Sequence, residues 1–495
     1  MVGDGGGHHV TARVGRTVVE VLAILVVVQL AFFGLLVAAQ AVPDGPIVTH
    51  LQEAVDEGTY GPTGRPDNMG AESTSFDECV AVGTGLGRPD LNPFERAARM
   101  PRIGSCSTGP DDIAALARGD TPDNVTEYFR YWAGWTVISR PVLALWGIDA
   151  LRRIAGALLV LAAGTFVAVV ARRTTSTYAL ALALPMLLGS NVLATPSTSL
   201  NQAISLSAAF LSPILTMIAV PRGWRATLVA TAVGAALYNY VDLMLTPAIP
   251  WMLATTTTIA VMLLRSERLQ PAVQRALAVA IAWPCAFAVT WASRWAIAVV
   301  LVGWDEAVTA IRDKVEFRLG GSSASVRDEF GASTQVSLDY WLANISTARA
   351  VLVGAGVVTV GALVVAVRRH GASRLRVFAL LAAPACFAPA WYELLRNHSQ
   401  IHPGKAHMSL PVALGVVVGA AVFAATTLRS RQGTVVPAEA STDTLPPAPR
   451  VLQPGSGVLG WRAVVGVARR GARADDPPRP TTVRDVAPAT RWWRC

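Results

Sequence analysis

Charged side chains are scarce in this sequence. Only 15% of its 495 residues are charged and 52% are hydrophobic, whereas soluble proteins carry about 25% charged residues. This composition excludes a water-soluble enzyme, and the high apolar content excludes a chain that is disordered throughout. Several apolar runs of about 20 residues are each long enough to cross a bilayer, so we expect a polytopic membrane protein.

Two common catalytic signatures are also missing. The sequence contains neither the phosphate-binding pattern G-x-x-x-x-G-K-[ST] nor the zinc-protease pattern H-E-x-x-H. Lysine is nearly absent, since Lys314 and Lys405 are the only two among 42 basic residues. The net charge of +9 is arginine charge that lies in membrane loops and near the C-terminus. It therefore predicts membrane orientation rather than nucleic-acid binding.

The apolar runs predict an all-α helical bundle of about ten spans within residues 17–428. Arginines gather in alternate connections, for example at Arg172, Arg268 and Arg369, and also just before the first span. Because positively charged loops stay on the cytoplasmic side, both termini are expected in the cytoplasm of a bacterial cell. The predicted flanking and loop segments are a cytoplasmic N-terminus (1–16), outer loops (42–153, 304–349 and 395–409) and a disordered cytoplasmic tail (429–495).

The apolar run 273–303 is longer than one crossing and contains Arg294. We expect a span that ends near Thr290, followed by a separate helix that lies in the membrane interface. The tryptophans at 291, 295 and 304 would then sit in the headgroup layer, where indole rings are favoured.

Two of the five cysteines, Cys79 and Cys106, fall in the first outer loop. Outside the cytoplasm a lone pair of cysteines tends to oxidise, so we expect a disulfide between them. Two free thiols are the alternative. A bridge would also restrain the acidic residues that directly precede its first cysteine.

Those acidic residues are Asp77 and Glu78. A carboxylate here can act as a general base, or bind a divalent metal that activates an acceptor hydroxyl. Asp56 and Glu57 offer the same chemistry closer to the first span. The alternative is a solvated acidic loop, because residues 41–150 hold 16 acidic residues in all.

Aromatic residues and arginine are interleaved at 128–135, which reads Tyr-Phe-Arg-Tyr-Trp-Ala-Gly-Trp, and Arg140 follows shortly after. The guanidinium groups of Arg130 and Arg140 can fork onto a phosphate, while the aromatic faces stack on a sugar or a lipid chain. An aromatic anchor at the membrane interface is the alternative.

Asp242 lies near the outer end of the predicted fifth span. An ionisable group at this depth is expensive to bury and indicates function by default. Arg294 is its expected ion partner. A purely structural Asp–Arg pair is the alternative.

A fourth group of residues follows the ninth predicted span, where His398, His402 and Lys405 fall close together. We expect His398 and His402 to share a helical face if that span extends so far. As a metal site the stretch lacks a third ligand, which Asp77 or Glu78 would have to supply. Anion binding is therefore favoured over metal binding, with a structural loop as the alternative.

Taken in order, four short motifs resemble those of a family of bacterial polytopic membrane proteins. That family is itself similar to the C-type glycosyltransferases, and the resemblance covers about residues 70–410. The motifs are Tyr131-Trp132-x-Gly134 with Arg140-Pro141, Tyr240-x-Asp242, Trp291-x-x-Arg294-Trp295 and Asn397-His398-Ser399-x-x-His402.

The resemblance implies transfer of a sugar from a polyprenyl-phosphate donor to a cell-envelope acceptor on the extracytoplasmic face. It implies Asp77 as the catalytic base, with Glu78 beside it, and a phosphate held by Arg130, Arg140, Arg294 and the loop 398–405. The sequence does not identify a cofactor. A transporter or flippase for a lipid-linked precursor, with Asp242 and Arg294 along its pathway, is the alternative function. A non-catalytic membrane protein is the second alternative.

Overall fold

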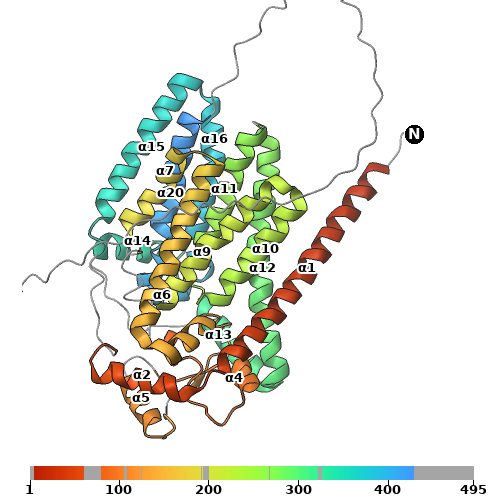
Figure 1. Cartoon of the computed structure of the whole chain (residues 1–495). Helices are drawn as coiled ribbons and strands as arrows, with labels where there is room; N and C mark the ends of the chain where they lie inside the picture. Colours follow the sequence, from red (N-terminus) through yellow and green to blue (C-terminus); the bar gives the residue numbers. More distant parts are fainter. Residues whose placement is uncertain are drawn as a thin grey trace, which may run out of the picture. The chain divides into compact units, whose positions relative to one another are not determined.

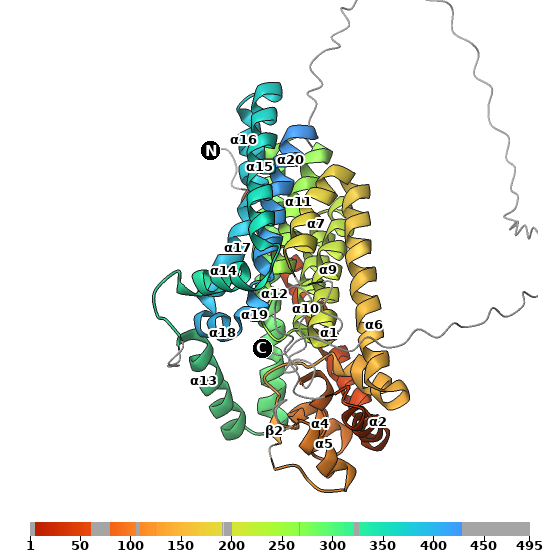
Figure 2. The ribbon, with the colours of Figure 1, turned by 90° about the vertical axis from the view of Figure 1, so that its left-hand side faces the viewer.

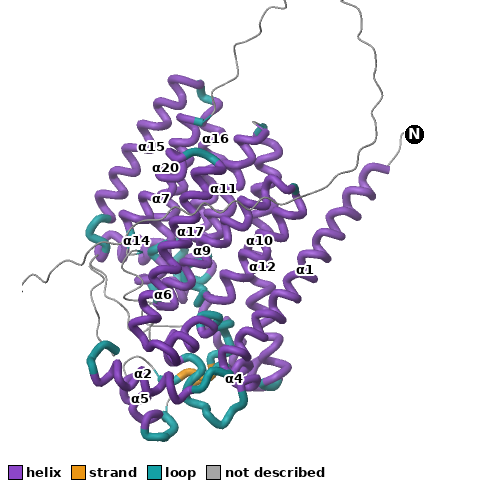
Figure 3. Tube along the Cα trace, in the orientation of Figure 1, coloured by secondary structure: helices purple, strands orange, loops and turns teal. Residues whose placement is uncertain are grey.

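The computed structural model describes residues 5–60, 80–104, 109–123, 125–190, 192, 200–266, 268–320 and 326–427. These residues are almost entirely helical, and their one sheet is a short antiparallel pair (Figure 3). The pair joins β1 (Pro101–Arg102) to β2 (Thr126–Glu127). The prediction of an all-α polytopic helical bundle is confirmed.

Ten helical runs follow the ten predicted spans. Among the described residues, eight stretches are long and apolar enough to cross a membrane. The other two runs are α7, which has 14 residues and is about 21 Å long, and α10, which has 18 residues. The runs are α1 (Gly5–Gln40), α6 (Thr136–Arg173), α7 (Ser176–Gly189), α9 (Leu200–Ala219), α10 (Trp224–Val241), α11 (Ala248–Ser266), α12 (Leu269–Leu301), α15 (Ala348–His370), α16 (Ser373–Ala382) continued by η2 (Ala383–Cys386) and α17 (Phe387–Leu394), and α20 (Ser409–Thr426).

The shorter helices gather toward one end of this bundle, which we call the loop end (Figures 1 and 2). They come from all three segments that were predicted as outer loops. They are α2 (Asp44–Asp56), α4 (Pro93–Arg99), α5 (Gly109–Ala117), α13 (Trp304–Gly320), α14 (Ala332–Asn344), α18 (Arg396–Ile401) and α19 (Pro403–Ala406).

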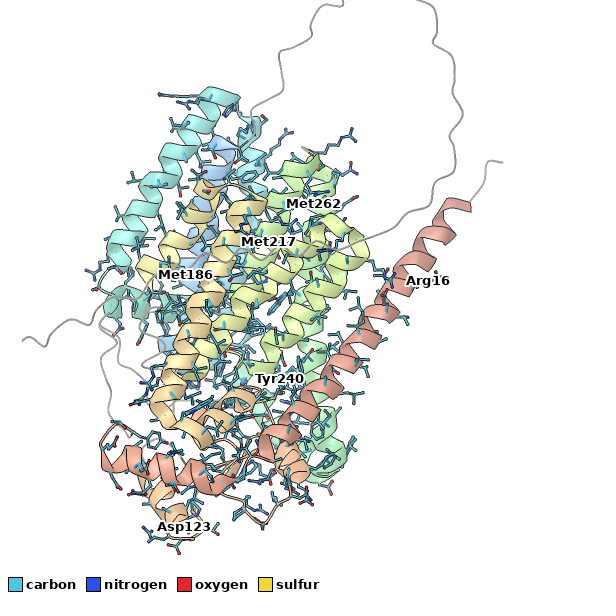
Figure 4. The ribbon with its side chains drawn as sticks, in the orientation of Figure 1. Arg16, Asp123, Met186, Met217, Tyr240 and Met262 are labelled. Carbon is cyan, nitrogen blue, oxygen red and sulfur yellow. The ribbon has the colours of Figure 1, made fainter. Side chains whose placement is uncertain are left out.

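The opposite end of the bundle, which we call the arginine end, carries the arginine-rich connections. Helix α6 ends there at Arg173, α12 starts there just after Arg268, and α15 ends there with Arg368 and Arg369. Figure 4 shows Arg16 near this end of α1 and Asp123 at the loop end. The arginine-rich connections therefore share one end, as the predicted alternation of loops requires.

Helix α12 corrects one expectation. The run was expected to break near Thr290, but α12 is a single helix of 33 residues. At 1.5 Å per residue it is about 50 Å long, whereas the hydrocarbon core is about 30 Å thick. Its last turns therefore pass beyond the membrane core while remaining helical. Helix α6 likewise begins at Thr136, inside the predicted outer loop, and is kinked at Gly147, where φ is 72°.

Small residues set the closest helix contacts. A Cβ at Gly415 of α20 would lie 2.2 Å from the carbonyl oxygen of Leu182 in α7. A Cβ at Gly234 of α10 would lie 2.7 Å from Oγ of Ser212 in α9. Membrane helices lack a hydrophobic driving force between them, so close packing of this kind holds the bundle together.

Candidate functional site

Two of the predicted motifs interlock at the loop end, where α10 ends. Gly134 donates its backbone N–H to the carbonyl oxygen of Tyr240 at 2.7 Å. A Cβ at position 134 would lie 2.4 Å from the Tyr240 ring and 2.6 Å from that carbonyl oxygen. Tyr240, labelled in Figure 4, stacks in turn on Phe32 of α1, with ring centroids 4.0 Å apart. Glycine is required at 134 because no side chain fits between the two segments.

The third motif, on α12, holds the same segment from the other side. The indole nitrogen of Trp132 donates to the carbonyl oxygen of Thr290 at 2.8 Å. Arg294 donates from Nε to the carbonyl oxygen of Tyr131 at 3.0 Å. The stretch 128–135 is thus fixed between α10 and α12, and three of the four predicted motifs meet at one place.

Arg294 is completely buried and serves mainly as a helix cap. Its Nη2 donates to the carbonyl oxygens of Ala97 and Ala98, at 3.0 and 2.8 Å, in the last turn of α4. A cation at this position satisfies terminal carbonyl groups and interacts favourably with the helix dipole. The expected ion pair with Asp242 was wrong, because the guanidinium group is bonded to carbonyl oxygens instead. Only Nη1 of Arg294 has no partner among the described residues.

Arg140 is also buried and bonded within the fold. It donates to the carbonyl oxygens of Ala39 (2.9 Å) and Val42 (2.7 Å), where α1 ends, and to that of Gly85 at 3.1 Å. It also forms an ion pair with Asp44 at the start of α2. Arg140 therefore joins α6 to the end of α1, and the phosphate contact predicted for it gains no support from this bonding.

Asp242 is buried in the connection between α10 and α11. The hydroxyl group of Tyr238 and the backbone of residues 243–245 lie beside its carboxylate group. One carboxylate oxygen, Oδ2, has no hydrogen-bond partner in the described part of the chain. Asp242 is therefore held by its own connection rather than by a cation.

Three arginines gather around two tyrosines of the first motif, and we call this group the cationic cluster: Arg102, Arg130 and Arg318 with Tyr128 and Tyr131. The guanidinium carbons of Arg102 and Arg130 lie 4.9 and 4.1 Å from the centroid of the Tyr128 ring. That of Arg318 lies 5.1 Å from the centroid of the Tyr131 ring. The two rings are 5.1 Å apart. Stacking on aromatic faces holds the charges in place.

The arginines of the cationic cluster are mostly without hydrogen-bond partners. Buried nitrogens with no partner among the described residues are Nε and Nη1 of Arg102, Nε of Arg130, and Nε and Nη1 of Arg318. No ion pair of the described residues joins the three to a carboxylate group. Arg318 does donate from Nη2 to the hydroxyl oxygen of Tyr131. The described chain therefore leaves five buried donor atoms of the cluster without an acceptor.

His398, from the fourth motif, lies beside this cluster. It is buried in α18, and its Nε2 has no partner in the described part of the chain. Burial lowers the pKa of His398 well below its usual value, and the positive charges of Arg318, His402 and Arg130 lower it further. The backbone of Leu243, next to Asp242, opposes this shift. A neutral imidazole thus borders the cluster, and all four motifs converge there.

His402 and Lys405 follow His398 in the chain. The ninth run ends at Leu394, so His398 lies instead in the separate short helix α18, and its C-cap residue His402 donates its backbone N–H to the carbonyl oxygen of His398. The rings of His398 and His402 still pack edge to face, 5.0 Å apart. Lys405 is partly buried in α19. The described residues contain no group of three or more possible metal ligands.

Backbone strain is concentrated around the same place. Three non-glycine residues of the described chain have positive φ: Met100 at 51°, Ala133 at 57° and Met244 at 64°. They belong to the segments that carry Arg102, Tyr131 and Asp242. Strained backbone of this kind clusters at functional sites, where the surrounding structure over-determines it.

Two acidic residues, Glu127 and Glu306, line a cavity together with Arg130. Arg99 binds Glu127 at 2.6 Å and Glu306 at 3.3 Å. Burial is the main effect on Glu127 and raises its pKa, although the hydrogen bond from Arg99 works against the shift. A cavity of about 160 Å³ lies between these acids, Arg130 and Trp295. The sequence analysis missed both carboxylate groups, although Glu127 directly precedes the aromatic stretch 128–135.

Asp77, Glu78, Cys79 and Cys106 lie outside the described residues, as does the tail 429–495. The proposed base and the disulfide therefore stay predictions. Two further residues of the cationic cluster, Arg102 and Arg318, were missed by sequence reasoning. Neither stands in a recognisable motif, and only the fold brings them to the tyrosines.

The fold defines a helical membrane protein with a cluster of arginines and tyrosines toward one end of its bundle. No family model, curated protein or solved structure matches the chain.

Proposed function

We propose that the protein is a membrane glycosyltransferase that takes its sugar from a lipid-phosphate donor and binds the phosphate at the cationic cluster. The observation that carries the proposal is the set of five buried arginine nitrogens that have no partner among the described residues. His398 and Arg130 were predicted as phosphate contacts from the sequence, and the structure adds Arg102 and Arg318 beside them.

The energetics favour an anion at this site. A buried charge without compensation costs several kcal/mol, and each buried donor left without a partner costs about 1–3 kcal/mol. Three arginines that share two aromatic rings also repel one another. A phosphate supplies both the missing negative charge and the acceptor oxygens, and the planar guanidinium group matches it well.

The position of the cluster suits a lipid headgroup. Tyr131 is bonded to α12, and Tyr240, which packs on Gly134, lies in the last turn of α10, so the site lies where membrane helices meet the loop end. A donor could keep its hydrocarbon chain in the bilayer while its phosphate reaches the arginines. Membrane lipids and a polyprenyl-phosphate sugar are therefore the expected partners.

The transfer step needs a base beside this phosphate. The acceptor hydroxyl oxygen bonds to the anomeric carbon and gives its proton to the base. The bond from that carbon to the phosphate oxygen breaks, and the phosphate leaves with the electron pair, stabilised by the cluster arginines. Asp77 is the proposed base, with Glu78 beside it. Glu127 is the nearest described alternative, since its raised pKa suits proton transfer.

We also propose that the arginine end faces the bacterial cytoplasm, because positively charged loops are retained there. The cationic cluster would then open on the extracytoplasmic side. Single cysteines placed at 369 and 123, in a background without the native cysteines, test this. An impermeant reagent should label intact cells at 123 alone, and labelling at 369 alone would invert the orientation.

The enzyme proposal is tested by transfer of labelled sugar from a lipid-linked pool to envelope glycan in membranes that contain the protein. Arg318→Gln should lower transfer about 10- to 100-fold, the loss expected for charge-assisted hydrogen bonds. Arg88→Gln is the matched control, because Arg88 is exposed and paired with Asp90 at the same end. Equal transfer by both variants and the wild type would refute the assignment of the site.

A lipid flippase is the second candidate. The buried carboxylate group of Asp242, with its unpartnered oxygen, is the observation that favours it. If Asp242→Asn stopped movement of a lipid-linked precursor while no sugar transfer could be detected in the wild type, the flippase would replace the enzyme.

A further inference from the structure

We infer that the donor held at the cationic cluster is a lipid diphosphate rather than a lipid monophosphate. This inference rests on the proposed function and narrows the class of its substrate. Three features of the cationic cluster support it: the number of charges, the number of nitrogens without a partner in the described chain, and the placement of the arginines.

The charge of the cationic cluster favours a diphosphate. Arg102, Arg130 and Arg318 contribute three positive charges, and in the described chain none is paired with a carboxylate group. His398 adds no charge while it is neutral. A sugar linked through one phosphate is a phosphodiester with a single negative charge. A sugar linked through a diphosphate carries two, so it leaves less positive charge uncompensated in a buried site.

The number of hydrogen-bond donors in the cluster also favours a diphosphate. Five guanidinium nitrogens of the cluster lack partners within the described part of the chain. A phosphodiester offers two non-bridging oxygens, whereas a diphosphate linkage offers four. Because buried donors that stay unpaired remain costly, the larger set of acceptors satisfies the cluster more completely.

The placement of the arginines favours an extended anion. Arg102 stacks on Tyr128, Arg318 stacks on Tyr131, and the two rings are 5.1 Å apart. Arg130 lies between them, 4.1 Å from one ring centroid and 5.4 Å from the other. The positive charge is thus spread along two neighbouring rings, which suits two linked phosphates better than one.

Binding of two simple probes tests the inference. Farnesyl-diphosphate-glucose and farnesyl-phosphate-glucose share one hydrocarbon chain and one sugar, and they carry two negative charges and one, respectively. Their affinities would be measured by calorimetry on the full-length protein purified in detergent. We expect the diphosphate to bind at least tenfold more tightly. Arg102→Gln and Arg318→Gln should each remove most of that preference, while Arg88→Gln should keep it.

Equal affinity for the two probes would overturn the inference and leave the proposed phosphate site standing. Failure of both probes to bind, or binding that ignores the cluster arginines, would instead reject the proposed function as well. The affinity ratio of the wild-type protein decides the question even if one arginine variant fails to fold.

Discussion

Replacing Gly134 with alanine should destabilise the protein and disturb the cationic cluster together. The new Cβ would lie 2.4 Å from the Tyr240 ring and 2.6 Å from its carbonyl oxygen, whereas unstrained carbon contacts need about 3.5–4.0 Å. The two segments would have to separate by about 1 Å. The ring cannot simply rotate away, because it is stacked on Phe32 and the carbonyl oxygen belongs to the backbone.

The size of the effect follows from two terms. Overpacking a tight contact costs about 1–3 kcal/mol, and the lost hydrogen bond from Gly134 to Tyr240 costs about 1 kcal/mol more. A loss of about 2–4 kcal/mol would lower the melting temperature in detergent by roughly 2–4 °C. Gly164→Ala is the control, because a Cβ at this position of α6 meets nothing within 4 Å. If the two variants melted at the same temperature as the wild type, the packing argument would fail.

Three further outcomes are expected. Gly415→Ala should lower the melting temperature strongly, because its Cβ would lie 2.2 Å from the carbonyl oxygen of Leu182, whereas Gly354→Ala, with open space, should not. Arg140→Gln should destabilise the protein by about 1–3 kcal/mol in thermal unfolding, since it removes charged hydrogen bonds to the carbonyl oxygens of Ala39 and Val42, whereas Asp44 keeps its second cation, Arg96. The pKa of His398 is lower in the folded protein than in the unfolded chain, so the unfolded chain takes up the proton first on acidification. Stability should therefore fall as the pH drops below about 6.5, by at most about 1.4 kcal/mol per pH unit, and His398→Gln should flatten this dependence in melting curves.

The helices could be predicted because each membrane span is a local property of its own stretch of sequence. Apolar length and the alternation of arginine-rich connections marked the ten runs without any knowledge of their packing. The continuity of α12 could not be predicted in this way. Arg294 reads as a charge that interrupts an apolar run, yet carbonyl groups of residues far away in the sequence satisfy it.

The candidate site was predictable only in part, for the same reason. Arg130 and His398 stand in motifs, so they could be singled out. Arg318 meets Tyr131 across 187 residues of sequence, and nothing near Arg318 signals that contact. The sequence correctly predicted that Asp242 is buried, but it did not predict what contacts the carboxylate group. Whether a buried carboxylate group meets a cation or the backbone of its own connection depends on the fold.

The capping of α4 by Arg294 has a consequence for biogenesis. Arg294 bonds to the carbonyl groups of Tyr131 and Ala97. It is synthesised 163 residues after the first and 197 residues after the second. At about 5–20 residues per second, roughly 10–30 s separate the emergence of Tyr131 from that of Arg294 at the ribosome. During this interval Arg294 cannot satisfy these carbonyl groups, so water must do so. Insertion of α12 therefore closes a segment that was made much earlier, and nascent chains that end before α12 should leave that segment open to proteases.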